Sequence, residues 1–438
     1  MKWQSPVNAQ KALSANLSIV IYPVKSLEYY AMEQPSQTDS RPSTKPTPQW
    51  IGATRVVILV AFLDLFMQFP VIAPYARTLG ATGTLVGVVV AAYSGANLIG
   101  NLVAGAILDK WGRKKPLLVG LLATALALLG YALSATPQQL VVVRALHGLA
   151  AAILTPGAFA ILGDSARAGQ RARVMGISGA FIAAAAVIGP LIAGIVRDKQ
   201  SPEAVFLLSA TIMLGTFFIF WYSVRKLVRM PEEISPQDDS RPEAASRGLP
   251  RLVTSYLAAL ALTVGLGTLV THLPIVLAER GESATRTGLT FTAFAVVAMI
   301  AMASPLSRVS DRFGRLVPMM AGLVSVSAGM LVLWASGGFP GAVLGMGIFG
   351  LGFGVLFPAM TALAAESVQQ NQRGKAFGIF FAVFSVGVVI GAMFSGLLAD
   401  RLGTATVLPY LISAIFALAI VPTIGVIWRL QKARTSGD

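Results

Sequence analysis

Long apolar runs, each of about twenty residues or more, dominate this sequence and limit what it can fold into. They lie near 53–76, 83–108, 116–134, 137–164, 174–196 and 203–225, and then near 252–278, 285–307, 316–335, 340–366, 375–398 and 405–429. A helix needs about 20 mainly apolar residues to cross the hydrocarbon core of a bilayer. Only 12% of the residues are charged, against about 25% in soluble domains. The runs therefore predict an all-α integral membrane protein with twelve crossings.

Polar segments flank and separate the two groups of six runs. Residues 1–52 are rich in Pro, Ser, Thr and Gln, a composition typical of disorder. One hypothesis is that residues 1–31 come from a start codon placed upstream of Met32. The predicted organisation is a tail (1–52), a six-helix half (53–225), a Pro-containing linker (226–251), a second six-helix half (252–429) and a short tail (430–438).

Lys and Arg residues are distributed unevenly between alternate loops. The loops after the odd-numbered runs contain six of them, whereas the loops after the even-numbered runs and the C-terminal tail contain twenty-one. Because cytoplasmic loops carry the excess of Lys and Arg, we expect a multi-pass protein of the inner (plasma) membrane with both termini in the cytoplasm. The basic residues that give the net charge of +15 then lie at the cytoplasmic face of the membrane. Because this location accounts for the charge, we expect no nucleic-acid partner.

The two groups of runs form an internal repeat. Matching residues recur at a constant separation of 202 positions, as in Asp109 and Asp311, Gly112 and Gly314, Arg113 and Arg315, Gly148 and Gly350, Pro156 and Pro358, Gly189 and Gly391, Gly194 and Gly396, and Asp198 and Asp400. Tandem halves of the same topology imply a pseudo-two-fold axis along the membrane normal, with a solute site between the halves near the midplane.

Reactive side chains are scarce. The chain contains no cysteine and two histidines, which excludes disulfides, thiolate metal sites and a metal cage made of histidines alone. We find no nucleophile, acid–base pair or metal cluster with suitable spacing. The sequence therefore predicts no cofactor, no metal and no enzymatic activity.

A charged loop that contains glycine follows the second run, and a weaker copy follows the eighth. The residues that define the two copies are Gly105, Asp109, Gly112 and Arg113, and Asp311, Gly314 and Arg315. The loop resembles the signature loop of the major facilitator superfamily, and the resemblance extends over about residues 53–429. It implies the major facilitator fold, with 12 transmembrane helices in two pseudo-symmetric six-helix halves, and a role for this loop as a cytoplasmic gate.

Elementary electrostatics supports a specific role for the acid in this loop. Asp109 lies at the C-terminal end of its predicted helix, where the helix dipole disfavours a carboxylate. It therefore needs a positive partner, which Arg113, Lys114 or the N-terminus of a helix in the other half could supply. The alternative is a basic loop that only sets the topology.

Three ionisable residues lie inside predicted crossings of the first half. Arg144-Ala-Leu-His147-Gly148 resembles a second motif of the superfamily, which occurs in many proton-coupled members. A charged side chain inside a spanning helix is costly and normally faces a cavity or a carboxylate. Asp64 lies near the middle of the first run, and the resemblance implies that the first and fourth helices meet. We therefore predict proton coupling by Asp64, Arg144 and His147, with Arg144 as the partner of Asp64; a static structural pair and a structural histidine are the alternatives.

Polar residues near these groups predict an aqueous path. Gln68 lies one turn after Asp64, and Ser94, Asn97 and Asn101 form a stripe on the second run. We predict that these four residues line the substrate cavity. Hydrogen bonding between helices explains such residues nearly as often.

The fifth run ends in Gly189-Pro190-Leu-Ile-Ala-Gly194. This stretch resembles the antiporter motif of superfamily exporters, in which glycine and proline permit close packing and a kink. The match is partial, because Ala185 and Ala193 stand where the fuller pattern has glycine. A generic packing face of small residues is the alternative.

These features favour secondary active transport. The main hypothesis is a proton-coupled exporter of hydrophobic or cationic small molecules, similar to drug:proton antiporters, which works by alternating access as a monomer. Its partners would be a small-molecule substrate, protons and the lipid bilayer. The alternatives are a transporter of one metabolite, such as a sugar or amino acid, and a membrane sensor that does not transport.

Overall fold

Helices form every regular element in the described part of the chain. The structure is a computed structural model that describes residues 49–164, 171–225, 248–304, 314–369 and 372–435. The predicted tail (1–52) and linker (226–251) therefore lie almost wholly outside the described residues, and so does Asp311.

The first half runs from α2 to α9. Its helices are α2 (Gln49–Met67), α3 (Ile72–Thr78), α4 (Gly83–Trp111), α5 (Lys114–Ala132), α6 (Pro137–Ala151), α7 (Leu154–Asp164), α8 (Arg171–Lys199) and α9 (Pro202–Val224). The second half consists of α10 (Leu249–Glu279), α11 (Ala284–Ala303), α13 (Leu316–Ala335), α14 (Gly338–Glu366), α15 (Arg373–Leu402) and α16 (Leu408–Thr435). Twelve segments of these described ranges are long and apolar enough to cross a membrane, as the sequence predicts.

Two predicted runs are interrupted in the structure. The first run divides into α2 and α3 at a turn over residues 68–71 that contains Pro70. The fourth run divides into α6 and α7 at residues 152 and 153. Pro156 lies four residues after Ala152, and a proline ring clashes with the carbonyl group four positions before it and cannot donate to it.

The two halves repeat the same packing. In the first half α2 packs on α8 and α9, and in the second half α10 packs on α15 and α16. Two helix pairs make most of the contact between the halves, α4 with α15 and α8 with α11, and α10 also meets α3 and α4. The arrangement is that of two pseudo-symmetric bundles, as the 202-residue repeat predicts.

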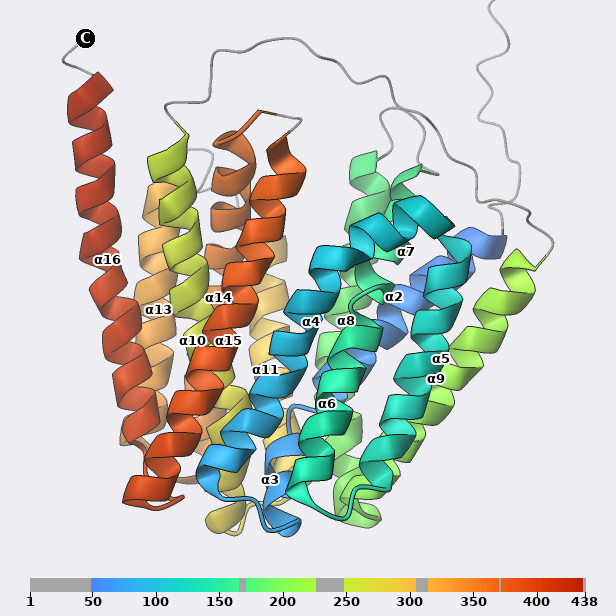
Figure 1. Cartoon of the computed structure of the whole chain (residues 1–438). Coiled ribbons are helices and arrows are strands. Elements are labelled where there is room, and N and C mark those ends of the chain that lie inside the picture. The colour runs from blue at the N-terminus through green and yellow to red at the C-terminus, as the bar shows by residue number, and fades with distance from the viewer. Residues whose placement is uncertain (1–48, 165–170, 226–247, 305–313, 370–371, 436–438) are drawn as a thin grey trace, which may run out of the picture. The chain divides into compact units, whose positions relative to one another are not determined.

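The halves approach one another closely at one end only, which we call the closed end. Here α4 and α11 begin and α8 and α15 end, and Figure 1 shows α4 and α15 converging toward it at the bottom of the view. A Cβ atom on any of five glycines at or near this end would lie within 3.0 Å of backbone atoms of the other half: Gly83, Gly87, Gly194, Gly288 and Gly396.

At the opposite end, which we call the linker end because α9 ends and α10 begins there, the same helices carry glycines in open surroundings. Added Cβ atoms would meet no described heavy atom within 4 Å at Gly105 of α4, Gly176 of α8, or Gly374 and Gly378 of α15. The described halves are therefore joined at the closed end and diverge toward the linker end.

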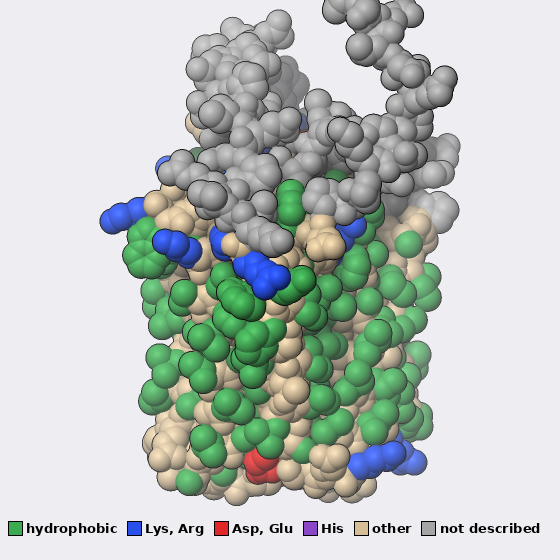
Figure 2. Space-filling view, turned by 90° about the vertical axis from the view of Figure 1, so that its right-hand side faces the viewer, with side chains coloured by type: hydrophobic (Ala, Val, Ile, Leu, Met, Phe, Trp, Pro, Cys, Tyr) green, Lys and Arg blue, Asp and Glu red, His purple; other side chains and the backbone are tan. Residues whose placement is uncertain are grey.

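The outer surface is suited to lipid. Figure 2 shows apolar side chains over most of the face in view, with Lys and Arg side chains gathered mainly at its upper edge, the linker end. Large apolar side chains such as Leu102 (69% exposed) and Leu126 (58% exposed) contribute to the exposed surface. Because lipid tails are as apolar as leucine, such exposure carries no penalty in a bilayer.

Candidate functional site

Five side chains form a closed polar network inside the first half. Arg144 on α6 donates a short hydrogen bond from Nη1 to Gln68 Oε1. Gln68 Nε2 in turn donates to Asp64 Oδ1 at 2.9 Å. These contacts make one arm of the network, in which an amide links the guanidinium group to the carboxylate.

The second arm passes through α5. Arg144 Nη1 lies 3.4 Å from Tyr131 Oη, and Tyr131 Oη lies 2.8 Å from His147 Nδ1. His147 Nε2 then lies 3.0 Å from Asp64 Oδ2, off the direction of a good hydrogen bond. The arms meet at Asp64, and we call Asp64, Gln68, Tyr131, Arg144 and His147 the buried network.

The buried network is sealed from solvent in this state. Asp64 is 3% exposed, Arg144 4% and His147 0%. A charge so deep in a membrane protein is tolerated only when it is paired or hydrogen-bonded. With a neutral His147, the formal charges of Asp64 and Arg144 cancel, and each has hydrogen-bond partners.

The geometry differs in one respect from the predicted pairing of Asp64 with Arg144. Gln68 stands between the two charged groups and bonds to both, while His147 makes the close contact with Asp64. Gln68 was predicted to line a substrate cavity, but it is 2% exposed and belongs to the buried network. The reason is helical spacing, because residues four apart lie on one face and within side-chain reach.

Two tyrosines complete the surroundings of Arg144, and the sequence did not single them out. The Arg144 guanidinium carbon lies 4.8 Å from the ring centre of Tyr93 and 5.8 Å from that of Tyr131. Arg144 Nε also donates to the backbone carbonyl of Val89 at 3.3 Å. Cation–π contacts of this kind are stronger when water is excluded, so the aromatic groups help to hold the buried charge.

Gly148 allows α6 to approach α4 beside the buried network. A Cβ atom there would come well under 3.0 Å from the backbone oxygen of Tyr93. Asn97 Nδ2 donates to the Gly148 carbonyl at 3.1 Å, and Asn101 Nδ2 donates to Asn97 Oδ1 at 2.7 Å. Asn101 is exposed and Ser94 is half-buried, so the predicted stripe on α4 serves helix packing at one end and reaches the surface at the other.

The predicted gate loop lies at the linker end, and its residues are in several environments. Gly105 and Asp109 are exposed, and Gly112 ends α4 with φ of 70°. Arg113 is half-buried at the start of α5. In this state Asp109 has no hydrogen bond or ion pair with another residue of the described ranges.

In the second copy of this loop, the structure describes two of the three predicted residues. Gly314 has φ of 80° and is exposed. Arg315 donates from Nε and Nη2 to Glu366 Oε1 at 3.0 and 2.7 Å. The contact joins the start of α13 to the end of α14, within the second half.

The antiporter-like motif on α8 packs against both halves. An added Cβ on Gly189 would meet Phe66 Cβ of α2 at 3.1 Å. The Pro190 carbonyl and Gly194 instead lie against Gly288 and Ala284 at the start of α11. The motif therefore lies in the contact between the halves.

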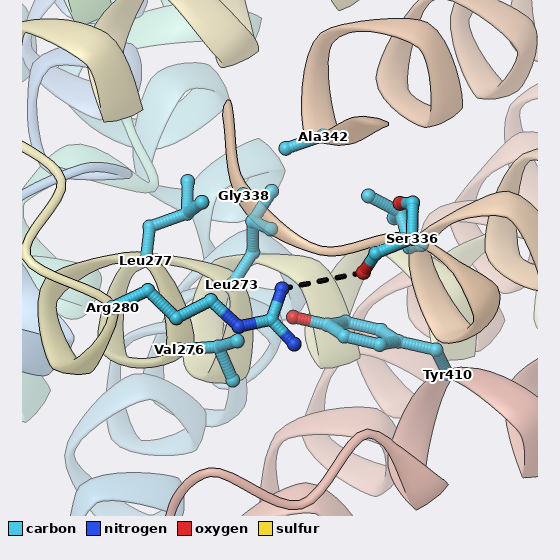
Figure 3. Close-up of a pocket in the computed structure, with 9 residues that line it drawn as sticks. Leu273, Val276, Leu277, Arg280, Ser336, Gly338, Ala342 and Tyr410 are labelled. Atoms are coloured by element: carbon cyan, nitrogen blue, oxygen red, sulfur yellow. Dashed lines mark hydrogen bonds between the residues drawn. The ribbon is translucent and has the colours of Figure 1, made fainter. Parts of the chain in front are cut away.

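A narrow pocket lies within the second half, at its closed end. Figure 3 shows the Arg280 side chain extending beside Tyr410 of α16, and Arg280 Nη1 donates to the Ser336 carbonyl at 3.3 Å. The remaining wall includes Leu273, Val276 and Leu277 of α10. These contacts tie the end of α10 to the connection between α13 and α14, and the pocket is separate from the buried network, which lies in the first half.

Sequence comparison identifies the family. The sequence model of the Major Facilitator Superfamily matches residues 56–301 and again residues 255–438. The chain belongs to the major facilitator superfamily. Its all-helical fold, its twelve candidate crossings and this membership show that it is a multi-pass membrane transporter.

Individual relatives of this transporter are distant. It is 25% identical over 346 residues to Multidrug resistance protein 1 of Bacillus subtilis (strain 168). The aligned region covers 78% of this chain and 88% of that protein. A bacterial homolog of the human lysosomal transporter Spinster, in an inward-facing and occupied conformation, superposes with a TM-score of 0.75 at 13% identity, covering 86% of this chain and 96% of that chain. The nucleoside transporter NupG gives a TM-score of 0.71 at 13% identity, covering 86% and 99%. The structural likeness establishes the fold, and the transporter resembles the drug-efflux branch in sequence.

Proposed function

We propose that this transporter exports hydrophobic or cationic small molecules in exchange for protons, by alternating access. The observation that carries the proposal is the buried network, which places Asp64 and His147 next to one another and links them to the positive charge of Arg144 through Gln68 and Tyr131. The similarity to Multidrug resistance protein 1 agrees with export of such molecules.

The charge balance of the buried network supplies a mechanism for coupling. With Asp64 ionised, the carboxylate offsets Arg144. A proton added to Asp64 or His147 leaves a net positive charge among side chains that water does not reach, and an uncompensated buried charge is strongly destabilising. Protonation should therefore disfavour this state and favour one in which the network is hydrated.

The two arms of the network have different chemistry. The amide of Gln68 can hold Asp64 and Arg144 in register, but it does not exchange protons readily. Tyr131 and His147 can each both donate and accept a hydrogen bond, so the arm through them offers a path for a proton. We assign Gln68 to positioning, and Tyr131 and His147 to proton movement.

The second half contributes an apolar face suited to hydrophobic cargo. Among the described residues of this half, no Asp, Glu, Lys or Arg is buried. Phe353 and Phe357 of α14 stack with their ring centres 5.3 Å apart, and both are half-buried. Planar side chains of this kind bind varied apolar ligands with few directional demands.

We assign the linker end to the cytoplasm, because the loops there hold most of the Lys and Arg residues. The present state would then be closed to the outside. In the proposed cycle Asp64 gains its proton when the transporter faces outward and loses it when the transporter faces inward, where cargo binds.

A transport assay in proteoliposomes tests this proposal. Purified wild type and Asp64→Asn are compared for movement of several lipophilic cations under an imposed pH gradient, and for exchange of labelled against unlabelled cation without a gradient. We expect the wild type to do both, and Asp64→Asn to lose gradient-driven transport, because its amide cannot take up and release a proton. Exchange by the variant reports separately on whether it still alternates.

One control variant makes the result interpretable. Glu203→Gln removes a carboxylate from the first turn of α9, outside the buried network, and should transport like wild type. Gradient-driven transport by Asp64→Asn would refute proton coupling through this residue. A wild type that moves none of the cations but moves a nucleoside, sugar or amino acid would refute the export of hydrophobic cations and support a metabolite transporter.

A further inference from the structure

Two aspartates at the closed end make matching contacts between the halves. Asp198 lies in the last turn of α8 in the first half, and its Oδ1 and Oδ2 accept hydrogen bonds from the backbone N–H groups of Ala284 (2.8 Å) and Thr285 (2.7 Å) in the second half. Asp400 lies in the last turn of α15 in the second half and accepts hydrogen bonds from the backbone N–H groups of Gly83 and Thr84 (2.7 Å) in the first half. Each half thus contributes one accepting carboxylate and one helix N-terminus whose N–H groups donate.

These contacts complete the capping of α4 and α11. The first four N–H groups of a helix have no partner within the helix. In α4 the aspartate takes the first two, the Thr82 side chain accepts from Leu85 N at 3.2 Å, and the Thr82 carbonyl accepts from Val86 N at 2.9 Å.

The first turn of α11 is satisfied in the same way. Asp198 takes its first two N–H groups, the Ser283 side chain accepts from Arg286 N at 3.2 Å, and the Ser283 carbonyl accepts from Thr287 N at 3.1 Å. At both helices, two of the four groups depend on the opposite half.

The position of each aspartate on its own helix makes the contact conditional on closure. A carboxylate at a helix C-terminus is disfavoured by that helix's dipole, whereas one at a helix N-terminus is favoured. Asp198 and Asp400 each lie at the C-terminus of one helix and the N-terminus of another. If the halves separate at this end, each carboxylate still lies at the C-terminus of its own helix, where the dipole is unfavourable. It no longer lies at the N-terminus of the helix in the other half, where the dipole is favourable.

Small residues make these contacts possible. The backbone of Gly396, one turn before Asp400, lies against Gly83, and the backbone of Ala284 lies against Gly194, one turn before Asp198. A larger side chain at either glycine would hold the helices apart and carry the carboxylate away from its partner amides.

We propose that Asp198 and Asp400 are a reciprocal pair of latches that set the conformational equilibrium of transport by holding the closed end shut. The proposal rests on the alternating-access part of the proposed function, but it requires neither proton coupling nor a particular cargo. Neutralising either aspartate should shift the population toward a state opened at this end, by about fivefold to tenfold. Neutralising both should shift it further, because the two contacts lie on different helix pairs.

The absence of cysteine from the chain makes a direct distance measurement possible. Spin labels at Gln200→Cys and Leu402→Cys report on the closed end across the halves, and labels at Lys110→Cys and Lys375→Cys report on the linker end. All four positions are exposed. Distance distributions are measured by pulsed electron paramagnetic resonance in nanodiscs, without substrate or pH gradient. Each labelled pair is studied in the otherwise wild-type chain and in Asp198→Asn, Asp400→Asn and the double variant.

We expect the aspartate variants to gain a population with a longer distance at the closed end and a shorter one at the linker end. Glu203→Gln, which removes a carboxylate at the closed end of α9, should match wild type. Unchanged distributions in the folded double variant would overturn the proposal, whatever the outcome of the transport assay.

A rescue variant separates the latch from ordinary helix capping. Thr82→Asp supplies a capping carboxylate to α4 from its own half, and in the Asp400→Asn background it should restore thermal stability without restoring closure. If closure returns together with stability, Asp400 only caps α4 and the latch is refuted. If Asp400→Asn alone folds poorly, the stabilised double variant Thr82→Asp/Asp400→Asn still allows closure to be measured.

Discussion

Replacing Gly148 by alanine should disturb the buried network without touching any of its polar groups. The new methyl group would lie well under 3.0 Å from the Tyr93 carbonyl oxygen, where ordinary contacts are about 3.5–4.0 Å. Relief requires α6 to move from α4 by about 1 Å, which is a large displacement for a packed helix pair. The new methyl group cannot rotate away, and the atom that it meets is backbone, so no side-chain rotation relieves the contact.

The size of this displacement can be compared with the hydrogen bonds that cross the same helix pair. The bond from Arg144 Nε to the Val89 carbonyl is 3.3 Å long, and that from Asn97 Nδ2 to the Gly148 carbonyl is 3.1 Å. A shift of about 1 Å lengthens both to about 4 Å, past the hydrogen-bonding range. Overpacking of this kind typically costs about 1–3 kcal/mol, and we expect the free energy of unfolding to fall by that amount.

Gly95→Ala is the matched control. Gly95 lies on the same helix as Tyr93 and Asn97, and a Cβ atom there would meet nothing within 4 Å. The assays are unfolding in mixed detergent micelles and gradient-driven transport in proteoliposomes. We expect Gly148→Ala to be less stable and slower, and Gly95→Ala to resemble wild type. If Gly148→Ala is as stable and as active as Gly95→Ala, the close approach of α6 to α4 is not what positions the network.

Two further predictions concern single polar contacts. Tyr131→Phe keeps the ring but removes the hydroxyl that contacts His147 Nδ1 at 2.8 Å. An unpaired buried polar group costs about 1–3 kcal/mol, so we expect lower stability in the same unfolding assay and slower gradient-driven transport with cation exchange retained. At the closed end, the Arg286 hydrogen bond, with that from Phe339 N, holds the pKa of Glu282 below its usual range. A group with a lowered pKa in the folded state contributes stability above its unfolded pKa and loses it in acid. The thermal midpoints of wild type and Glu282→Gln should therefore differ at neutral pH and converge below about pH 4, and a gap that is independent of pH would refute this role.

The sequence predicted the fold well because membranes constrain it so strongly. An apolar run must satisfy its backbone within a helix, so run length alone located the crossings, and the 202-residue repeat paired the halves. The breaks after α2 and α6 were missed, because a proline in an apolar run either kinks or interrupts a helix. Pro358, the counterpart of Pro156, lies inside the continuous α14, so the residue type does not decide the outcome.

The candidate site was predicted only in part. Asp64 and Arg144 were found because buried charge is expensive and therefore conspicuous. Tyr131 was missed because a tyrosine in an apolar run is usually packing, and it lies more than ten positions from any other member of the network. Its role depends on α5 packing against α6, which no local pattern encodes. The shared register of Asp198 and Asp400 was visible, but not that each reaches a helix of the opposite half.

The uneven distribution of buried charge between the halves has a consequence for how such a transporter can diversify. The network that we assign to energy coupling lies wholly in the first half, whereas the described core of the second half contains no buried Asp, Glu, Lys or Arg. On the proposed function, substitutions at Phe353 and Phe357 of α14 should change the cargo and leave the proton coupling intact. After duplication, the first half could keep the residues for proton coupling while the second half acquired residues for different substrates. A chimera that exchanges only the second half with that of a relative should therefore transport the relative's substrates.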